Sequence, residues 1–277
     1  RLWIDEEKIQ RGSIIDRNGK ILAYSEKEGE TYKRVYNYGY LYSHIIGYSY
    51  REYGKSGLEL EYNNSLLNIS ESATLNELRN LVTPNTEGNT LKLTIDHHLQ
   101  EYSRNLLKGK KGAVVTMNPT TGEIYSMVSM PDFNSSALKE NWSNIVEDEN
   151  SPLLNRVTSG LYQPGSTFKV LTAIAAIENG KTDEKYQCTG STIIDGYKLS
   201  DYDEKAHGNI SLNDALVYSC NPFFGEMAVE IGKDKLGEVA ERFLINKKIP
   251  FDLPVKVSSF PNKGNIGKTD IAAAGIG

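Results

Sequence analysis

The strongest constraint on the fold is a helix start whose first turn carries two reactive side chains. Pro164-Gly165 stops the segment before it, and the mostly apolar run at 170–178 ends at Asn179-Gly180. This pattern predicts a helix that opens at Ser166, because Pro and Gly mark its start and Asn-Gly marks its end. Residues three apart share a helix face, so the Lys169 amine is predicted to approach the Ser166 oxygen.

Ser166 and Lys169 form a Ser-x-x-Lys tetrad, which can support nucleophilic chemistry. A serine hydroxyl is a weak nucleophile and needs a base, and a lysine can serve when burial keeps it neutral. The helix N-terminus also favours a developing alkoxide. Taken alone, such a tetrad is more often a capped helix start with a solvated lysine, so the rest of the sequence decides between the two interpretations.

A second polar motif, Ser219-Cys220-Asn221, follows further along the chain. Ser211 and Asp214 resemble a capping box that opens a short helix ending at this motif. Residues 222–231 are predicted to continue as a helix closed by Gly232. The motif is therefore predicted to lie between two helices.

Further blocks of sequence accompany these two motifs in a fixed order. Their positions are 11–23, 54–63, 93–100, 118–124, 155–162 and 207–216. Together with the Ser-x-x-Lys and Ser-x-Asn motifs, they make the chain resemble the class B penicillin-binding proteins over nearly its whole length. The ordered set is specific, whereas either motif alone is a weak signal.

The resemblance implies an α+β fold: a penicillin-binding transpeptidase domain, similar to the serine β-lactamases, with an antiparallel sheet flanked by helices. A small N-terminal pedestal domain is expected over 1–108, and a C-terminally incomplete transpeptidase domain over 109–277. Local patterns agree with this division. A strand is predicted at 91–95, a helix capped by Asp96 after it, and a hairpin over 112–130.

The resemblance also implies an acyl transfer on cell-wall peptides. Ser166 would attack the carbonyl between two D-alanines of a stem peptide, and Lys169 would accept its proton. Ser219 would relay a proton to the departing D-alanine, while Asn221 would bind the substrate amide and orient the lysine. An amine of a neighbouring stem peptide would then attack the acyl-enzyme and form a cross-link. Penicillin and other β-lactams would intercept the same serine.

The expected partners are peptidoglycan stem peptides, β-lactams, a glycosyltransferase and other proteins of the cell-wall machinery, with no cofactor and no nucleic acid. The resemblance places the parent protein at the extracytoplasmic face of the bacterial cell membrane, anchored by an N-terminal segment outside residues 1–277. The net charge of −5 argues independently against a phosphate-backbone ligand, which favours a basic surface.

The third motif of the family, a Lys-Thr-Gly strand, does not occur in the 277 residues. Lys268-Thr269-Asp270 imitates it, but Asp replaces the glycine, and 271–277 is predicted to be helical. We expect a C-terminal portion to supply the motif, and residues 1–277 alone to have weak or no activity. The loss of one oxyanion donor typically costs on the order of 10²-fold in rate.

The chain has two cysteines, Cys188 and Cys220, and four histidines. Their spacing matches neither a zinc motif nor a disulfide framework, so no metal site is predicted, and two buried thiols are favoured over a bridge. The adjacent His97 and His98 are expected to face solvent at a helix start.

Two other functions stay open from the sequence. A serine β-lactamase or β-lactam sensor of the same superfamily also uses Ser-x-x-Lys, but those with this tetrad usually carry Ser-x-Val in place of Ser219-Cys220-Asn221 and lack the block at 11–23. A non-catalytic scaffold that binds cell-wall or division proteins is the other alternative. Intact Ser166 and Lys169 argue against a decayed site, although not against a dual role.

Overall fold

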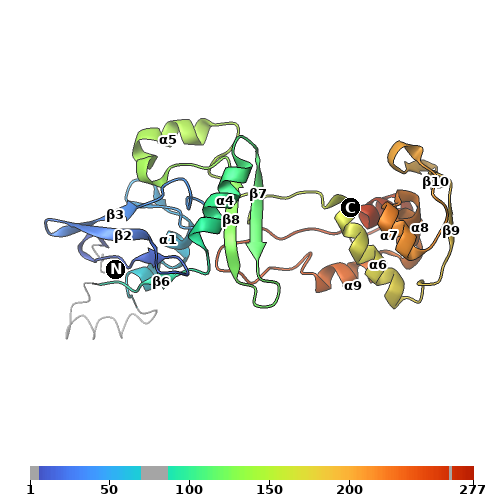
Figure 1. The fold of residues 1–277 in the computed structure, drawn as a ribbon, viewed down its shortest axis with the longest axis horizontal. Helices are drawn as coiled ribbons and strands as arrows, with labels where there is room; N and C mark the ends of the chain where they lie inside the picture. The colour runs from blue at the N-terminus through green and yellow to red at the C-terminus, as the bar shows by residue number, and fades with distance from the viewer. Residues whose placement is uncertain (1–5, 70–86, 262–263) are drawn as a thin grey trace. The chain divides into compact units, whose positions relative to one another are not determined.

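The computed structural model describes residues 6–69, 87–261 and 264–277 (Figure 1). The chain forms two compact units, Arg1–Gly160 with Phe251–Pro254, and Leu161–Pro250 with Val255–Gly277. A compact unit need not coincide with an evolutionary domain. The predicted domain boundary at residue 108 therefore stays a prediction. Within the described residues, no helix is both long and apolar enough to cross a bilayer.

A four-stranded sheet in the order β3-β2-β1-β6 organises the first unit. β2 (Ile21–Glu28) pairs antiparallel with both β1 (Ile14–Ile15) and β3 (Thr31–Tyr36), and β6 (Leu91–Lys92) pairs parallel with β1. The predicted strand at 91–95 is thus confirmed over its first two residues. The shorter elements of this unit are η1 (Glu6–Lys8), β4 (Ser49–Tyr50), β5 (Gly54–Lys55), α1 (Gly57–Glu61), α2 (Asn63–Leu66), η2 (Ser135–Ala137) and α5 (Leu138–Glu147).

A buried ion cluster joins three segments of this unit. Glu59 in α1 is 0% exposed, and its carboxylate accepts hydrogen bonds from Arg11 Nε at 2.5 Å and from Arg34 Nε at 2.6 Å. The Arg11 guanidinium also donates to the Glu59 carbonyl oxygen at 2.6 Å. Buried charges persist only with such partners, because an isolated buried charge is strongly destabilising.

A hairpin of β7 (Gly112–Met117) and β8 (Ile124–Met130) packs on α4 (His97–Leu107), as Figure 1 shows. Gln100 projects from the helix onto β8. Its side-chain amide donates to the Met127 carbonyl oxygen at 2.8 Å and accepts from the Met127 N–H at 2.7 Å. The predicted hairpin is confirmed. The Gln100 amide connects the helix to the backbone of β8 in the hairpin.

The start of α4 differs in one respect from the expectation. Asp96 caps the helix as predicted, because its carboxylate accepts a hydrogen bond from the Leu99 N–H at 3.0 Å. His98 is exposed, but the solvent-facing position expected for His97 is wrong. The His97 ring is buried, and its Nδ1 lies 2.9 Å from the Tyr42 hydroxyl. Tyr42, which is distant from His97 in the sequence, therefore helps to bury the His97 ring.

The second unit is built around α8 (Asn221–Ile231), and Figure 1 shows its helices gathered together. The helices that contact α8 are α6 (Lys169–Glu178), α9 (Lys233–Arg242) and α10 (Lys268–Ile276). The approach of α10 depends on small side chains, since a Cβ added to Gly275 would lie only 2.2 Å from the Cβ of Ala228. Phe223 and Phe224 of α8 are buried in the core of this unit.

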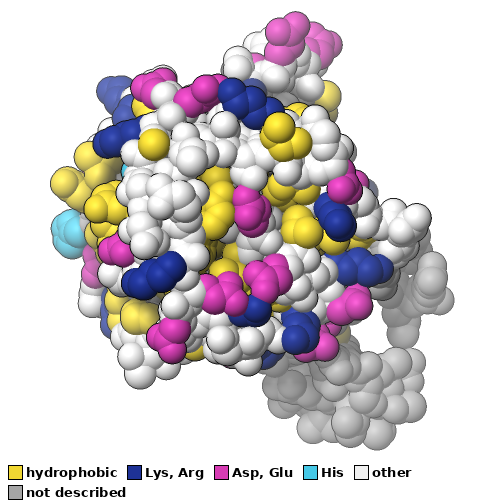
Figure 2. Space-filling view, turned by 90° about the vertical axis from the view of Figure 1, so that its right-hand side faces the viewer, with side chains coloured by type: hydrophobic (Ala, Val, Ile, Leu, Met, Phe, Trp, Pro, Cys, Tyr) yellow, Lys and Arg dark blue, Asp and Glu magenta, His cyan; other side chains and the backbone are white. Residues whose placement is uncertain are grey.

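Short strands accompany these helices. β10 (Ser191–Ile194) pairs antiparallel with β11 (Tyr197–Ser200), and β9 (Tyr186–Cys188) pairs antiparallel with β12 (Gly208–Ile210). α10 begins at Lys268 and ends at Ile276, so the helix predicted over 271–277 is confirmed through Ile276, and Lys268-Thr269-Asp270 forms its first turn. The face drawn in Figure 2 carries acidic and basic side chains interspersed, with hydrophobic side chains between them.

We expect Glu59→Gln to destabilise the protein by about 3–5 kcal/mol, because it leaves two buried guanidinium groups without their counter-charge. Denaturant unfolding followed by circular dichroism measures the effect. Glu52→Gln is the matched control, since Glu52 pairs with Lys139 at 2.8 Å on the surface and its loss should leave the midpoint unchanged. Equal midpoints for the two variants would contradict a structural role for the cluster.

Candidate active site

The first turn of the predicted helix is tighter than an α-helix. Ser166 lies in η3 (Gly165–Phe168), a 3-10 turn that runs into α6 at Lys169. Gly165 has a φ of 57°, and its N–H donates to the Gly277 carbonyl oxygen at 3.0 Å. The left-handed conformation suits glycine, and the contact with Gly277 holds the turn from outside. Ser166 is exposed, whereas Lys169 is only 1% exposed.

The Lys169 amine is held by three oxygen atoms of the second motif. Its Nζ donates to the Ser219 carbonyl oxygen at 2.5 Å, to Ser219 Oγ at 3.0 Å and to Asn221 Oδ1 at 2.6 Å. An ammonium group has three donors, so these contacts can satisfy all of them. The structure thus brings together three of the four residues that the sequence singled out.

Local sequence explains how the second motif reaches the lysine. Ser211 and Asp214 form the predicted capping box at the start of α7 (Leu212–Tyr218). Ser219 ends that helix in the left-handed conformation, with φ 56° and ψ 42°, and Asn221 begins α8. The sharp reversal between the two helices directs both the carbonyl and the hydroxyl of Ser219 at one amine. The predicted position of the motif between helices is confirmed.

Asn221 is itself held in place by the strand beside it. Its side-chain amide donates to the Ser200 carbonyl oxygen at 3.1 Å, at the end of β11. This bond determines which amide atom faces the lysine, because the nitrogen is occupied by Ser200 and the oxygen is left to accept from Nζ. The neighbouring Asp201 carboxylate accepts from the Asn221 N–H at 3.4 Å.

The electrostatic environment lowers the pKa of Lys169. Burial is the main cause, since it disfavours the charged amine, and the nearby Asp201 carboxylate opposes the shift by favouring the charge. The Nζ also lies 5.9 Å from the centroid of the Phe224 ring. A lysine in such a site is closer to neutrality at physiological pH than an exposed one, which is the property that a general base requires.

Ser166 lies three residues before Lys169 along the same helical segment, but the hydrogen bonds assigned to Nζ within the described residues all lead to the second motif. The predicted approach of Lys169 to Ser166 therefore stays a prediction. The distance between a nucleophile and its base in the absence of substrate does not show whether the two act together, because catalytic hydrogen bonds often tighten only in the complex.

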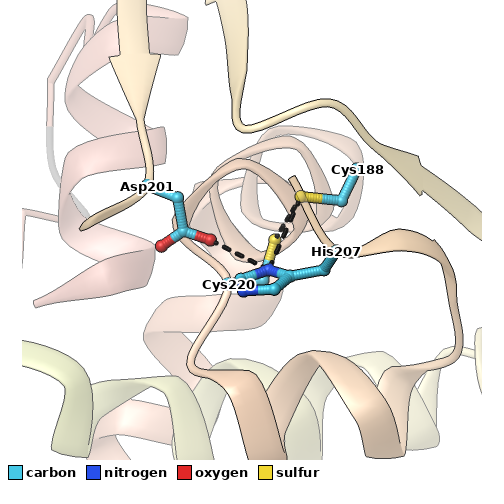
Figure 3. Close-up of side chains that lie close together, drawn as sticks. All are labelled: Cys188, Asp201, His207 and Cys220. Atoms are coloured by element: carbon cyan, nitrogen blue, oxygen red, sulfur yellow. Dashed lines mark hydrogen bonds and ion pairs between the residues drawn. The ribbon is translucent and has the colours of Figure 1, made fainter. Parts of the chain in front are cut away.

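Four side chains that could hold a metal ion lie beside this site (Figure 3). They are Cys188, Asp201, His207 and Cys220, and one donor atom of each lies within 4.8 Å of the others. Both cysteines are buried and free, as the sequence favoured. Burial raises the pKa of the Cys220 thiol, so the thiol stays protonated in the absence of a cation.

No spacing pattern along the chain indicated this four-residue group, because its members come from four separate segments. Cys188 ends β9, Asp201 follows β11, His207 precedes β12, and Cys220 lies between α7 and α8. Zinc motifs are recognised by short, regular spacing, which such an arrangement does not produce. Two thiols, an imidazole and a carboxylate are nevertheless a set of donors that suits Zn²⁺.

Comparison with models of known protein families shows to which family the chain belongs. The family model of the penicillin-binding protein transpeptidase domain matches residues 112–277, and that of the penicillin-binding protein A dimerisation domain matches residues 11–91. The chain belongs to the class B penicillin-binding proteins. The α+β transpeptidase fold implied by the resemblance is confirmed, together with a separate N-terminal domain.

Relatives of this penicillin-binding protein carry transpeptidase names. It is 29% identical to the peptidoglycan D,D-transpeptidase MrdA of Acinetobacter baumannii over 264 residues, which cover 83% of the chain and 39% of the relative. It is 30% identical to the peptidoglycan D,D-transpeptidase PbpA of Mycolicibacterium smegmatis over 280 residues, which cover 93% of the chain and 57% of the relative. The chain therefore spans less than two thirds of the length of these relatives.

Solved structures show the same fold. Penicillin-binding protein A from M. tuberculosis, in a ceftriaxone acyl-enzyme complex, matches with a TM-score of 0.88 and 28% identity over 99% of this chain and 66% of that one. The D,D-transpeptidase domain of a peptidoglycan glycosyltransferase from Eggerthella lenta matches with a TM-score of 0.84 and 33% identity over 98% of this chain and 62% of that one.

We expect the stability of Lys169→Met at pH 7 to lie within about 1 kcal/mol of the wild type, because removal of the cost of burying the charged amine offsets the loss of its three hydrogen bonds. The folded-state pKa of Lys169 lies below its ordinary value of 10.5, so burial of the charged amine costs stability at low pH. This cost disappears as the pH rises from the lowered pKa towards 10.5, and the wild type should gain on the variant in that window. Thermal unfolding at several pH values measures both effects.

The control for this experiment is Lys139→Met. The hydrogen bond to Glu52 raises the pKa of Lys139, so the charged amine of Lys139 stabilises the folded protein, whereas that of Lys169 destabilises it. The stabilisation by Lys139 is lost as the pH rises through its folded-state pKa. A large loss of stability in Lys169→Met at pH 7 would show that the buried lysine supports the fold, against our expectation.

Proposed function

We propose that this chain carries the acyl-serine site of a peptidoglycan D,D-transpeptidase. The observation that carries the proposal is the buried Lys169 amine, which contacts Ser219 and Asn221 and lies in the same helical segment as the exposed Ser166. A solvated surface lysine, the ordinary alternative for a lone Ser-x-x-Lys, does not have this burial. The relatives named above are peptidoglycan D,D-transpeptidases, which supports the same reaction.

In the proposed reaction, each polar group has one task. Lys169, in its neutral form, takes the proton of the Ser166 hydroxyl as the oxygen attacks the carbonyl between two D-alanines. The hydroxyl of Ser219, 3.0 Å from the amine, relays a proton to the departing D-alanine nitrogen. Asn221 keeps the amine in place and offers its amide group to the substrate.

Charge development in this reaction is stabilised by backbone groups. The Ser166 N–H at the start of η3 is one donor to the oxyanion, and the helix that follows adds its dipole. The second donor is expected from a Lys-Thr-Gly strand of the full-length protein. An amine of a neighbouring stem peptide then attacks the acyl-enzyme, which completes a cross-link and frees the serine.

The partners of the proposed enzyme follow from its substrates. Stem peptides ending in D-Ala-D-Ala are the acyl donors, and a second stem peptide supplies the acceptor amine. β-Lactams mimic the donor and acylate the same serine; the relative from M. tuberculosis was solved as an acyl-enzyme complex with ceftriaxone. We also place the protein at the extracytoplasmic face of the membrane, with an N-terminal anchor and a glycosyltransferase partner.

Acylation by benzylpenicillin tests the proposal in the full-length protein. We expect a stable adduct on Ser166, located by intact mass and peptide mapping, and no adduct in Ser166→Ala. In Lys169→Arg the positive charge remains but cannot be lost, since a guanidinium stays protonated, so acylation should fall by on the order of 10²-fold or more. Ser65→Ala, an exposed serine of the first unit, is the control and should acylate normally.

The outcomes separate the alternatives. Rapid turnover of the β-lactam without an accumulating adduct would indicate a β-lactamase. An adduct on another residue, or normal acylation of Lys169→Arg, would overturn the roles given to Ser166 and Lys169. A Ser166→Ala variant that restores growth to a null strain would indicate a scaffold.

The pH dependence of acylation provides an independent test. The neutral amine is the reactive form, so the rate constant should rise with pH and level off above the pKa of Lys169. Because burial lowers that pKa, the plateau should begin below 10.5. Stopped-flow acylation with a chromogenic cephalosporin measures the profile, and a rate independent of pH across this range would contradict the role of Lys169 as base.

A further inference from the structure

The end of α10 lies against the turn that carries Ser166. The Gly165 N–H donates to the Gly277 carbonyl oxygen, and in Figure 1 the mark C, at Gly277, lies beside the start of α6. The two segments approach closely, because a Cβ added to Gly277 would lie only 2.0 Å from the Gly165 carbonyl oxygen. The residue immediately before Ser166 is therefore held by a segment that is distant in the sequence.

A different kind of contact holds the other side of Ser166. Phe168, at the end of η3, is 5% exposed, and its ring stacks on that of Phe260 with the centroids 5.4 Å apart. Apolar packing thus fixes the turn after Ser166, whereas a backbone hydrogen bond to Gly277 fixes it before Ser166. The positions of the Ser166 hydroxyl and N–H therefore depend on where α10 ends.

A buried hydroxyl group fixes that end of α10. Thr172, three residues after Lys169 in α6, is 0% exposed, and its Oγ1 donates to the Gly275 carbonyl oxygen at 2.7 Å. The last four carbonyl groups of a helix have no donor within the helix, so a buried helix end needs a donor from elsewhere. Gly275 lies in the last turn of α10, and Thr172 supplies its donor.

The direction of this hydrogen bond distinguishes Thr172 from an ordinary helical threonine. The hydroxyl of a threonine within a helix commonly bonds to a carbonyl group of the preceding turn of the same helix. The hydrogen bond assigned to Thr172 leads instead to a neighbouring helix. A residue that only filled space between α6 and α10 would not require a hydroxyl there, so the contact indicates that the relative position of the two helices matters.

We propose that Thr172 is a positioning residue of the acyl-transfer site: its hydroxyl holds the end of α10, and α10 holds the turn at Gly165 and Ser166 in the geometry in which the serine attacks. This inference rests on the proposed function. Lys169 acts on the proton of the serine, while Thr172 acts only through α10. A small displacement of a nucleophile slows its reaction without weakening substrate binding, because attack requires a narrow range of distances and angles.

Thr172→Val in the full-length protein is the test, because valine keeps the shape of the side chain and removes the hydrogen bond. Stopped-flow acylation with a chromogenic cephalosporin separates the dissociation constant of the first complex from the rate constant of acylation. We expect the rate constant to fall by about 10-fold and the dissociation constant to stay unchanged. The pH midpoint of acylation should also stay unchanged, because the contacts of Lys169 with Ser219 and Asn221 are intact.

Three further variants show whether the hydroxyl is responsible. Thr172→Ser keeps the hydroxyl and should acylate as the wild type. Thr172→Cys carries a weaker donor of similar size, so its rate should lie between those of the wild type and Thr172→Val, and it replaces Thr172→Val if that variant does not fold. Thr189→Val is the matched control, since Thr189 is exposed and its hydroxyl also donates to a backbone carbonyl, that of Ser191 at 3.1 Å.

Hydrogen exchange at the Gly165 amide tests the contact without any substrate. We expect this amide to exchange faster in Thr172→Val than in the wild type, because its acceptor at the end of α10 is less well fixed. Thr172→Ser should restore the slower exchange. The Asp214 amide, which donates to Ser211 Oγ at 3.2 Å, is an internal reference and should exchange equally in all variants.

Three results would overturn the proposal. If Thr172→Val acylates and exchanges as the wild type, the hydroxyl does not position the turn. If Thr172→Ser is as slow as Thr172→Val, the methyl group is responsible and Thr172 only packs. If the pH midpoint moves, Thr172 acts through Lys169. Should the wild type itself form no adduct, the proposed function fails and the role of Thr172 in acylation fails with it, while exchange at Gly165 still shows whether the hydroxyl holds the turn.

Discussion

The chemistry of the second unit depends on one buried amine. Lys169 is almost fully shielded from water, and it is tolerated there because three oxygen atoms of a distant segment surround its Nζ. Taking a charged group out of water is costly unless its donors are satisfied. The contacts between the start of α6 and the turn that joins α7 to α8 follow from this requirement, and they also create the chemistry of the site.

The turn at Ser219, Cys220 and Asn221 serves two neighbouring groups at once. Its outer residues contact the lysine, while its central cysteine lies 3.5 Å from Cys188 in the four-residue group. Asp201 connects the two, because its carboxylate accepts from the Asn221 N–H and opposes the lowering of the Lys169 pKa. The four-residue group and the amine therefore share both Asp201 and the turn at Cys220.

Much of the local structure could be predicted, and the reasons are specific. The capped start of α4 at Asp96, the capping box at Ser211 and the hairpin of β7 and β8 depend on residues close together in the sequence. The burial of His97 against Tyr42 could not be predicted, because the covering residue lies 55 positions away. The four-residue group was missed for the same reason, since no two of its members belong to one element.

The sequence by itself determined the family, the position of the helix that carries Ser166 and Lys169, and the helix reversal that follows Ser211. Capping, helix period and the breaking of helices by Pro and Gly act over a few residues, so they can be read along the chain. Only the tertiary structure decided that the Lys169 amine is buried, that Asn221 presents its oxygen to it, and that two thiols, an imidazole and a carboxylate meet beside the site. Burial and hydrogen-bond partners depend on which distant segments pack together, and that information is not contained in the spacing of residues along the chain.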